Sequence, residues 1–328
     1  MRKPVCLLLG LLTLAMMQSA LAAKRLGPPI EDLQSTPERI RIVVAEALKK
    51  PEPGKITFAV TERLTGDAPD DVVLRTDPAT FDGVTVGASY VVAWSYQRRN
   101  RRVIGGWEED PEGPFVVSVL GLGSTALFEG TPEMRLLFTP GVITDPARAG
   151  EAIDALLAQM QRDDYRSRGL VVTELWLRED LTEKMTAEQA GIMKTVLQTK
   201  ALDPQHQELL LQSVYRLPPD MTTPWLAEEL RKIIILRGTQ YDLGTFVPSL
   251  VLTAAEGLRQ AGNPGDVDLL STLLYSNNPG VSKAALAAMD HLDREAAVAR
   301  AKQAMERGWI HGETRNVLNR YLSTGSIR

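Results

Sequence analysis

The fold of this chain is decided by a stretch at residues 278–292 that reads NPGVSKAALAAMDHL. It opens with a turn-forming Asn-Pro-Gly and continues with apolar residues at helical spacing, from Val281 through Ala285 to Leu292. Related phrases recur through the C-terminal half, reading DYRSRGLVVTEL at 164–175, DPQHQELLLQSV at 203–214, FVPSLVLTAAEGL at 246–258 and HGETRNVLNRYL at 311–322. Their spacing of about 32 to 43 residues falls in or near the range of two-helix solenoid repeats.

The recurring phrases predict the second helices of five helix pairs. First helices are expected near residues 148–161, 187–199, 223–236, 266–275 and 294–307. A pair this short cannot bury its apolar stripe alone, so neighbouring pairs must supply the other wall. The unit at 266–292, leucine-rich and then alanine-rich, resembles the HEAT-like family of α-helical repeats. The resemblance covers about residues 147–322 and implies protein–protein scaffolding.

The N-terminal half has the pattern of short strands separated by Gly/Pro turns. Strands are expected at 39–44, 55–64, 71–75, 89–96, 102–104, 115–119 and 134–137. The first of these has an alternative, because Thr-Pro-Glu at 36–38 could also start a helix. Many short strands with such turns indicate a small barrel or sandwich.

Three segments of this half carry a second resemblance: VTERLTG at 60–66, VVLR at 72–75 and VGASYVVA at 86–93. Together they are similar to the netrin-like module of tissue inhibitors of metalloproteinases, which implies an OB-like barrel over about residues 39–140. That family inhibits proteases through an N-terminal cysteine, which the processed chain is expected to lack. The resemblance therefore implies the fold without the inhibitory activity.

The predicted fold class is multidomain, all-β followed by all-α, with a small OB-like β-barrel preceding a HEAT-like α-solenoid. The expected parts are a signal peptide at 1–23, a tether at 24–38, the barrel domain at 39–143, the helical repeat domain at 144–323 and a C-terminal tail at 324–328.

The first residues have the pattern of a secretory signal. Arg2 and Lys3 precede an apolar run at 5–17, and QSALA at 18–22 ends in a small-x-small cleavage pattern. The run is shorter than the ~20 apolar residues of a membrane-spanning helix. Cleavage after Ala22 or Ala23 is therefore favoured over an uncleaved anchor, and the mature chain is expected to have no transmembrane helix.

Composition limits the compartment and the partners. The only cysteine, Cys6, lies within the signal, so the mature chain would have no disulfide, thiol nucleophile or cysteine metal site. The absence of disulfides favours the bacterial periplasm over a secreted eukaryotic protein. Without Arg2 and Lys3 the chain has 35 basic and 41 acidic residues, a net charge of −6, which disfavours nucleic acid as a partner.

The most concentrated charge of the mature chain is QRRNRR at 97–102, which contains Arg98, Arg99, Arg101 and Arg102. One interpretation is the solvated tip of a hairpin. The other is an anion-binding tip for a phospholipid head group, an acidic glycan or an acidic partner. The acidic run EEDPE at 108–112 follows closely and could neutralise the arginines.

Signatures of catalysis, cofactors and metals are not found. His206, His291 and His311 lie in separate repeats and lack metal-ligand spacing. The acidic pairs at 70–71 and 163–164 are interpreted as turn and capping residues. No nucleophile elbow, phosphate loop or zinc-protease motif occurs, and GLG at 121–123 lacks the third glycine of a dinucleotide loop. The aromatic residues Trp94, Tyr96 and Trp107, beside the arginines, are interpreted as barrel core or rim rather than a ligand platform.

The leading hypothesis is an exported, non-enzymatic interaction protein that holds a protein or peptide partner of the cell envelope on its solenoid. An alternative is an envelope-surface module that binds anionic lipid or glycan through the arginine tip. A hydrolase or protease inhibitor ranks third, because the patterns for nucleophiles and metal ligands are missing.

Overall fold

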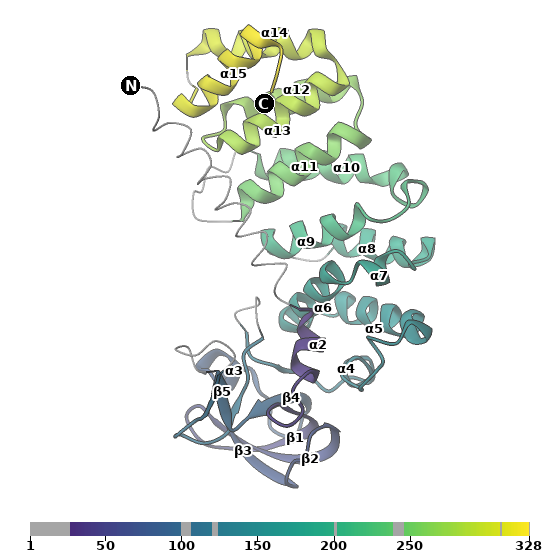
Figure 1. The fold of residues 1–328 in the computed structure, drawn as a ribbon, viewed down its shortest axis with the longest axis vertical. Helices are drawn as coiled ribbons and strands as arrows, with labels where there is room; N and C mark the ends of the chain where they lie inside the picture. The colour runs from purple at the N-terminus through teal and green to yellow at the C-terminus, as the bar shows by residue number, and fades with distance from the viewer. Residues whose placement is uncertain are drawn as a thin grey trace. The chain divides into compact units, whose positions relative to one another are not determined.

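Figure 1 presents a computed structural model of the chain, which describes residues 27–99, 106–119, 124–199, 202–238, 246–308 and 310–327. The chain divides into two compact units, Met1–Arg178 and Glu179–Arg328. The predicted signal peptide lies outside the described residues. In the described ranges, no helix combines the length and the apolar character needed to cross a bilayer.

The first unit contains a closed five-stranded barrel. Its six-stranded sheet has the order β1-β2-β3-β7-β4-β8, and the additional pairing of β1 with β4 closes the first five of these strands into a ring, while β8 pairs with β4. Neighbouring strands are antiparallel except for β3 and β7, which pair in parallel. The bounds are β1 (Arg41–Glu52), β2 (Lys55–Thr65), β3 (Asp71–Arg75), β4 (Ser89–Ser95), β7 (Phe115–Val116) and β8 (Leu127–Glu129). This ring, with a short helix between its third and fourth strands, confirms the predicted OB-like barrel.

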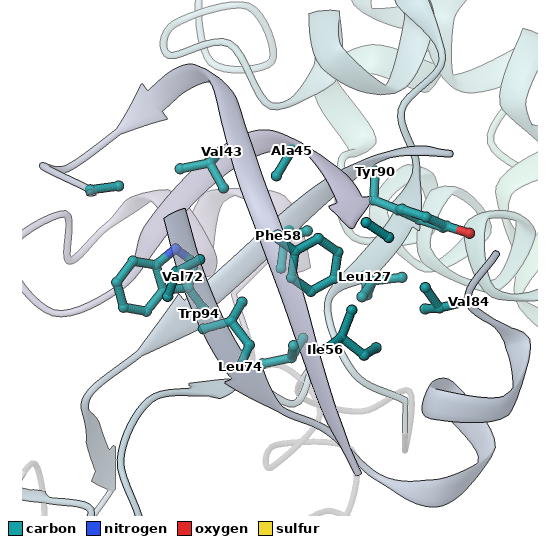
Figure 2. Close-up of a cluster of buried hydrophobic side chains, with 14 residues drawn as sticks. Val43, Ala45, Ile56, Phe58, Val72, Leu74, Val84, Tyr90, Trp94 and Leu127 are labelled. Carbon is teal, nitrogen blue, oxygen red and sulfur yellow. The ribbon is translucent and has the colours of Figure 1, made fainter. Parts of the chain in front are cut away.

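The barrel interior is filled by one apolar cluster, shown in Figure 2. Phe58, Leu74 and Trp94 have no exposed surface, and the rings of Phe58 and Tyr90 meet edge-on with centroids 6.4 Å apart. Alternation along the strands directs these residues inward. Each large apolar side chain buried in this way contributes about 1.5–3 kcal/mol, so the cluster is the main source of stability for the barrel.

Local signals set the turns between the strands. Pro53-Gly54 joins β1 to β2, and Gly54 adopts a φ of +76°, which favours glycine. Between β3 and β4 lies the helix α3 (Pro78–Gly83), whose N-cap Asp77 accepts a hydrogen bond from the Thr80 amide. The strands on both sides were predicted, whereas this helix was not.

One predicted strand is wrong. Residues 134–137 belong to the helix α4 (Pro132–Leu137), because Thr131 caps it by accepting from the Met134 amide and Pro132 occupies its first turn. The strand that follows β7 is instead β8, which was not predicted. The predicted strand at 115–119 ends at Val116, and the predicted strand at 102–104 lies outside the described residues.

The residues expected to form a tether include a packed helix, α2 (Pro29–Gln34). Ile30 and Leu33 are buried, and the Ile30 amide donates to a buried carboxylate oxygen of Glu174 at 2.8 Å. A free tether would leave both apolar side chains in water, so burial against the helix α6 (Tyr165–Leu177) orders this segment.

The helical part of the chain contains all ten helices of the predicted pairs. In the first unit, α5 (Ala149–Gln161) pairs with α6. In the second unit, after the short α7 (Glu179–Thr182), the pairs are α8 (Ala187–Thr199) with α9 (Pro204–Val214), α10 (Pro219–Arg237) with α11 (Val247–Ala261), α12 (Val267–Ser271) with α13 (Pro279–Leu292), and α14 (Arg294–Arg307) with α15 (Gly312–Thr324). The 3₁₀ turns η1 (Pro146–Arg148), η2 (Pro264–Asp266) and η3 (Thr272–Tyr275) precede α5 and flank α12.

The second unit has the two layers of an α-solenoid (Figure 1). The first helices α8, α10, α12 and α14 contact one another in order, and so do the second helices α9, α11, α13 and α15. The regular phrases start with capped helices, because Asp203 and Asn278 accept hydrogen bonds from amides of the first turns of α9 and α13. The two looser phrases begin without a side-chain cap, at Phe246 and His311.

Candidate functional site

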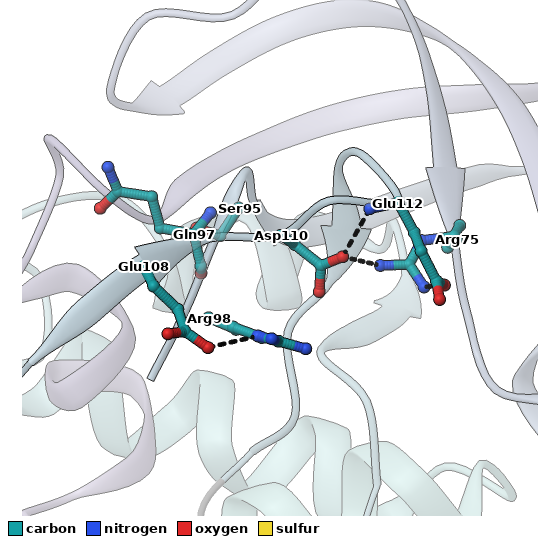
Figure 3. A network of polar contacts seen from close by, with 7 residues as sticks. All are labelled: Arg75, Ser95, Gln97, Arg98, Glu108, Asp110 and Glu112. Carbon is teal, nitrogen blue, oxygen red and sulfur yellow. Dashed lines mark hydrogen bonds and ion pairs between the residues drawn. The ribbon is translucent and has the colours of Figure 1, made fainter. Parts of the chain in front are cut away.

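The arginine-rich segment begins in a hairpin inserted between the fourth and fifth barrel strands. Its strands are β5 (Gln97–Arg99) and β6 (Trp107–Glu109), which place Arg98 opposite Glu108. Arg98 Nε donates to Glu108 Oε1 at 2.8 Å, and both side chains are exposed (Figure 3). Since β-pairing sets this contact, part of the predicted neutralisation by the acidic run is confirmed.

The hairpin is fastened to the barrel by an arginine outside the predicted set. Arg75, at the end of β3, donates to Asp110 Oδ1 at 2.7 Å and also binds Glu112 (Figure 3). Asp110 is the better buried acceptor, with an exposed fraction of 11% for its side chain, and it also accepts from the Glu112 amide at 3.0 Å. Two of the four acidic residues at 108–112 are therefore committed to Arg75.

The four predicted anion-binding residues are only partly described. Arg98 is paired as above, and Arg99 lies on β5 with its backbone opposite Trp107. Arg101 and Arg102 lie outside the described residues. The described part of the segment is therefore a β-hairpin in which Arg98 forms an ion pair with Glu108.

Aromatic rings and two further arginines surround the base of the hairpin. The Arg41 guanidinium lies 5.2 Å from the ring centroids of both Trp94 and Tyr96, and Arg39 lies 5.4 Å from the ring of Trp107. Trp94 has no exposed surface, in agreement with a core role, whereas Tyr96 is 42% exposed. Arg41 also donates to the Asp67 carbonyl at 2.7 Å, so these contacts fix it against the barrel.

A polar cluster that the sequence did not reveal lies between the second helices α9 and α11. Glu208 Oε1 accepts from Ser249 Oγ at 2.7 Å, from Gln212 Nε2 at 3.0 Å and from Thr253 Oγ1 at 3.4 Å. Burial raises the pKa of Glu208 above its ordinary value, and the three hydrogen bonds oppose that effect. Only the spacing of Glu208 and Gln212, one helical turn apart, could have indicated a shared face.

Charged and polar side chains continue along the solvent-facing side of the second helices. Glu256 on α11, Lys283 and His291 on α13 and Arg320 on α15 are exposed. Between α13 and α15, the Tyr321 hydroxyl donates to Asp290 Oδ1 at 2.6 Å. The second layer thus presents hydrogen-bonding groups of both charges over successive helices.

The remaining candidates from the sequence have structural roles. His206 is largely buried and its Nδ1 contacts Asp203, the N-cap of its own helix, whereas His291 lies on α13 and His311 directly precedes α15. Asp164 caps α6, as predicted, and Asp70 pairs with Arg63 at the turn before β3. In the part of the chain that the structure describes, no three potential metal ligands come together.

Each unit contains a pocket among its described residues. One of about 370 Å³ lies in the first unit, where the start of β4 meets the turn after β8. The other, of about 230 Å³, lies between α12 and α14 in the second unit.

No family model, curated protein or solved structure matches the chain.

Proposed function

We propose that the chain is an exported, non-enzymatic interaction protein that binds a protein or peptide on the second-helix layer of its solenoid. The observation that carries this proposal is the unbroken succession of contacts from α9 through α11 and α13 to α15. A layer built from repeats offers an extended surface, and extended surfaces suit macromolecular partners.

The chemistry of that layer suits a partner with both polar and charged groups. Glu208 is held by three hydrogen bonds, so its carboxylate is positioned before a partner arrives. Glu256 and Lys283 present opposite charges on adjacent helices of the layer. Complementary charges of this kind give specificity and faster association more than raw affinity.

Site-specific photo-crosslinking in cells tests the proposal. A photo-reactive residue would replace the exposed Glu256 or Lys283 in the second layer, and matched controls would carry it at the exposed Glu295 or Lys302 of α14, in the first layer. We expect one discrete crosslinked partner from the second-layer positions and none from the controls. Equal crosslinking from both layers, or none from either, would contradict the proposed surface.

A second candidate function is anion binding at the arginine tip. It is favoured by the pairing of Asp110 and Glu112 with Arg75, which leaves only Glu108 and Glu109 of the acidic run to balance the four arginines of the sequence at 97–102. Replacing all four arginines by serine should weaken binding to vesicles rich in anionic lipid, and added salt should weaken binding of the parent chain. Unchanged vesicle binding after the replacement would remove this candidate.

A further inference from the structure

The larger pocket is bounded by two connections of the first unit. One is the turn that leads into β4 and contains Thr85, and the other follows β8 and contains Gly130 and Thr131. Ser89, Tyr90 and Glu129 complete the polar wall. Its volume of about 370 Å³ falls within the range of small-molecule sites, which begins near 300 Å³, whereas the pocket between α12 and α14 is below that range.

The walls of this pocket are fastened before any ligand binds. The Thr85 amide donates to the Tyr90 hydroxyl at 2.8 Å, and the Gly130 amide donates to the Ser89 carbonyl at 2.8 Å. Tyr90 belongs to the barrel core, and its hydroxyl extends away from Phe58 (Figure 2). These bonds tie both connections to β4, so a ligand would not bear the cost of ordering them.

Helical residues fix the far side of the pocket. Arg162, next to the end of α5, donates to Glu129 Oε2 at 2.8 Å, and the Gln159 amide group binds Thr131 Oγ1. Gly130 is needed for the close approach of the two walls, because a Cβ there would lie 2.6 Å from Ser89 Oγ and 2.9 Å from the Ser89 carbonyl carbon. Glycine at this position therefore shapes the pocket.

The lining selects against several ligand classes. The one charged liner is Glu129, which repels an anion, and its pairing with Arg162 lowers its attraction for a cation. Peptide recognition usually uses an exposed sheet edge or an apolar groove, but here the apolar lining is limited to Ala88 and the Tyr90 ring. The remaining groups are hydroxyls, which both donate and accept, and one oriented carboxylate.

From this chemistry we infer that the pocket is a binding site for a neutral, polyhydroxylated ligand, namely one or two sugar units of a glycan. Ser89 and Thr85 are exposed residues that contribute hydroxyls to the lining, and Glu129 accepts from ligand hydroxyls with the oxygen that Arg162 leaves available. The site is independent of the proposed partner surface, which lies on helices of the second unit.

Calorimetric titration of the processed chain with maltose, cellobiose and N,N′-diacetylchitobiose tests the inference. Inorganic phosphate and a neutral Gly/Ser hexapeptide serve as probes of the competing classes. We expect saturable binding of at least one disaccharide, and about tenfold weaker binding in each of Ser89→Ala and Glu129→Gln, the loss that about 1.4 kcal/mol produces. The control variants Ser323→Ala and Glu183→Gln change exposed groups in the second unit and should bind as the parent does.

The inference is overturned if no disaccharide binds below about 10 mM, or if phosphate or the peptide binds in preference. It is also overturned if both pocket variants bind a sugar as tightly as the controls. Amide chemical shifts of Ser89 and Thr131 provide a second readout, which should move on titration even where a variant is less stable. Loss of crosslinking from the second helices would leave these results unaffected, so the two proposals can fail separately.

Discussion

The barrel and the second-unit solenoid differ in how their elements depend on one another. In the barrel, β1 pairs with both β2 and β4, so the ring closes only when its first and fourth strands meet. In the solenoid, each second helix contacts the second helices before and after it in the chain, as α11 does with α9 and α13. A closed ring is stabilised as a whole, whereas a stack of repeats is stabilised by the sum of its neighbour contacts.

The largest effect on stability is expected when one fully buried side chain is replaced by alanine in the core of the barrel or in the core of the solenoid. Phe58→Ala removes a fully buried ring from the barrel and should cost about 3–5 kcal/mol, and Leu286→Ala in α13 should cost about 2–5 kcal/mol. Hydrogen exchange should reveal a loss of protection over all barrel strands in the first variant. In the second variant we expect the loss to be confined to α13 and the helices that contact it.

The proposed difference between barrel and solenoid would be contradicted if Phe58→Ala removed hydrogen-exchange protection from β2 alone. It would also be contradicted if Leu286→Ala removed protection equally from every helix of the second unit. Ile42→Val, another fully buried position of the barrel, provides a mild control with an expected cost of about 0.5–1.5 kcal/mol and unchanged exchange pattern.

A stability change of intermediate size is expected at a glycine where a helix lies close to its neighbours. A Cβ on Gly257 of α11 would overlap the Tyr215 hydroxyl and lie 2.8 Å from Leu230 Cδ1, so Gly257→Ala should destabilise the second unit by about 1–3 kcal/mol. Gly191 in α8 has no atom near the position of its Cβ, so Gly191→Ala should stabilise by about 0.5–1 kcal/mol. Urea unfolding measures both, and equal effects of the two changes would contradict the packing described.

Prediction from the sequence was also more successful for the helical repeats than for the barrel. The helical phrases carry their own apolar period and several begin with their own cap, so α8 and α14 begin and end where the sequence predicted. The short barrel segments are ambiguous, and MRLL at 134–137 was predicted as a strand although Thr131 and Pro132 start a helix. Closure of the ring depends on the pairing of Ile42 with Ala93, which no local pattern contains.

The candidate sites were harder to predict for the same reason. The contact of Arg98 with Glu108 could be anticipated, because both residues lie in one hairpin. The capture of Asp110 by Arg75 could not, since it requires the parallel pairing of β3 with β7. The Glu208 cluster joins two helices of different repeats, and neither segment alone distinguishes its residues from an ordinary solvated face.

The pH dependence of stability tests individual carboxylates within the solenoid. The Arg231 guanidinium, bound to Asp266 at 2.6 Å and 3.0 Å, holds the pKa of that carboxyl below its ordinary value of ~3.9. The stability from Asp266 is complete above the unfolded pKa and is lost as pH falls through the folded pKa. Asp266→Asn should therefore cost about 1–2 kcal/mol at pH 7 and reduce the loss of stability in acid.

Glu208 should behave in the opposite way. Burial raises its pKa above the unfolded value of ~4.3, so its ionisation lowers stability as pH rises from the unfolded pKa through the folded one. Glu208→Gln keeps an acceptor for Ser249 and should raise the melting temperature at pH 7 by about 1–2 °C. At pH 3 the variant and the parent should melt together, and a gain at pH 3 as large as the gain at pH 7 would exclude titration as the cause.

The smallest expected effect belongs to the hairpin, where both ions of the Arg98–Glu108 pair remain in solvent. Their side chains are 51% and 41% exposed, so water and salt screen the attraction, and a double-mutant cycle should give a coupling of about 0.2–1 kcal/mol. The Arg75–Asp110 pair, with 26% and 11% exposure, should give a larger coupling that persists at higher salt. If the two couplings were equal and equally sensitive to salt, Arg75 would not anchor the hairpin, and the excess of arginine proposed for the tip would lose its structural basis.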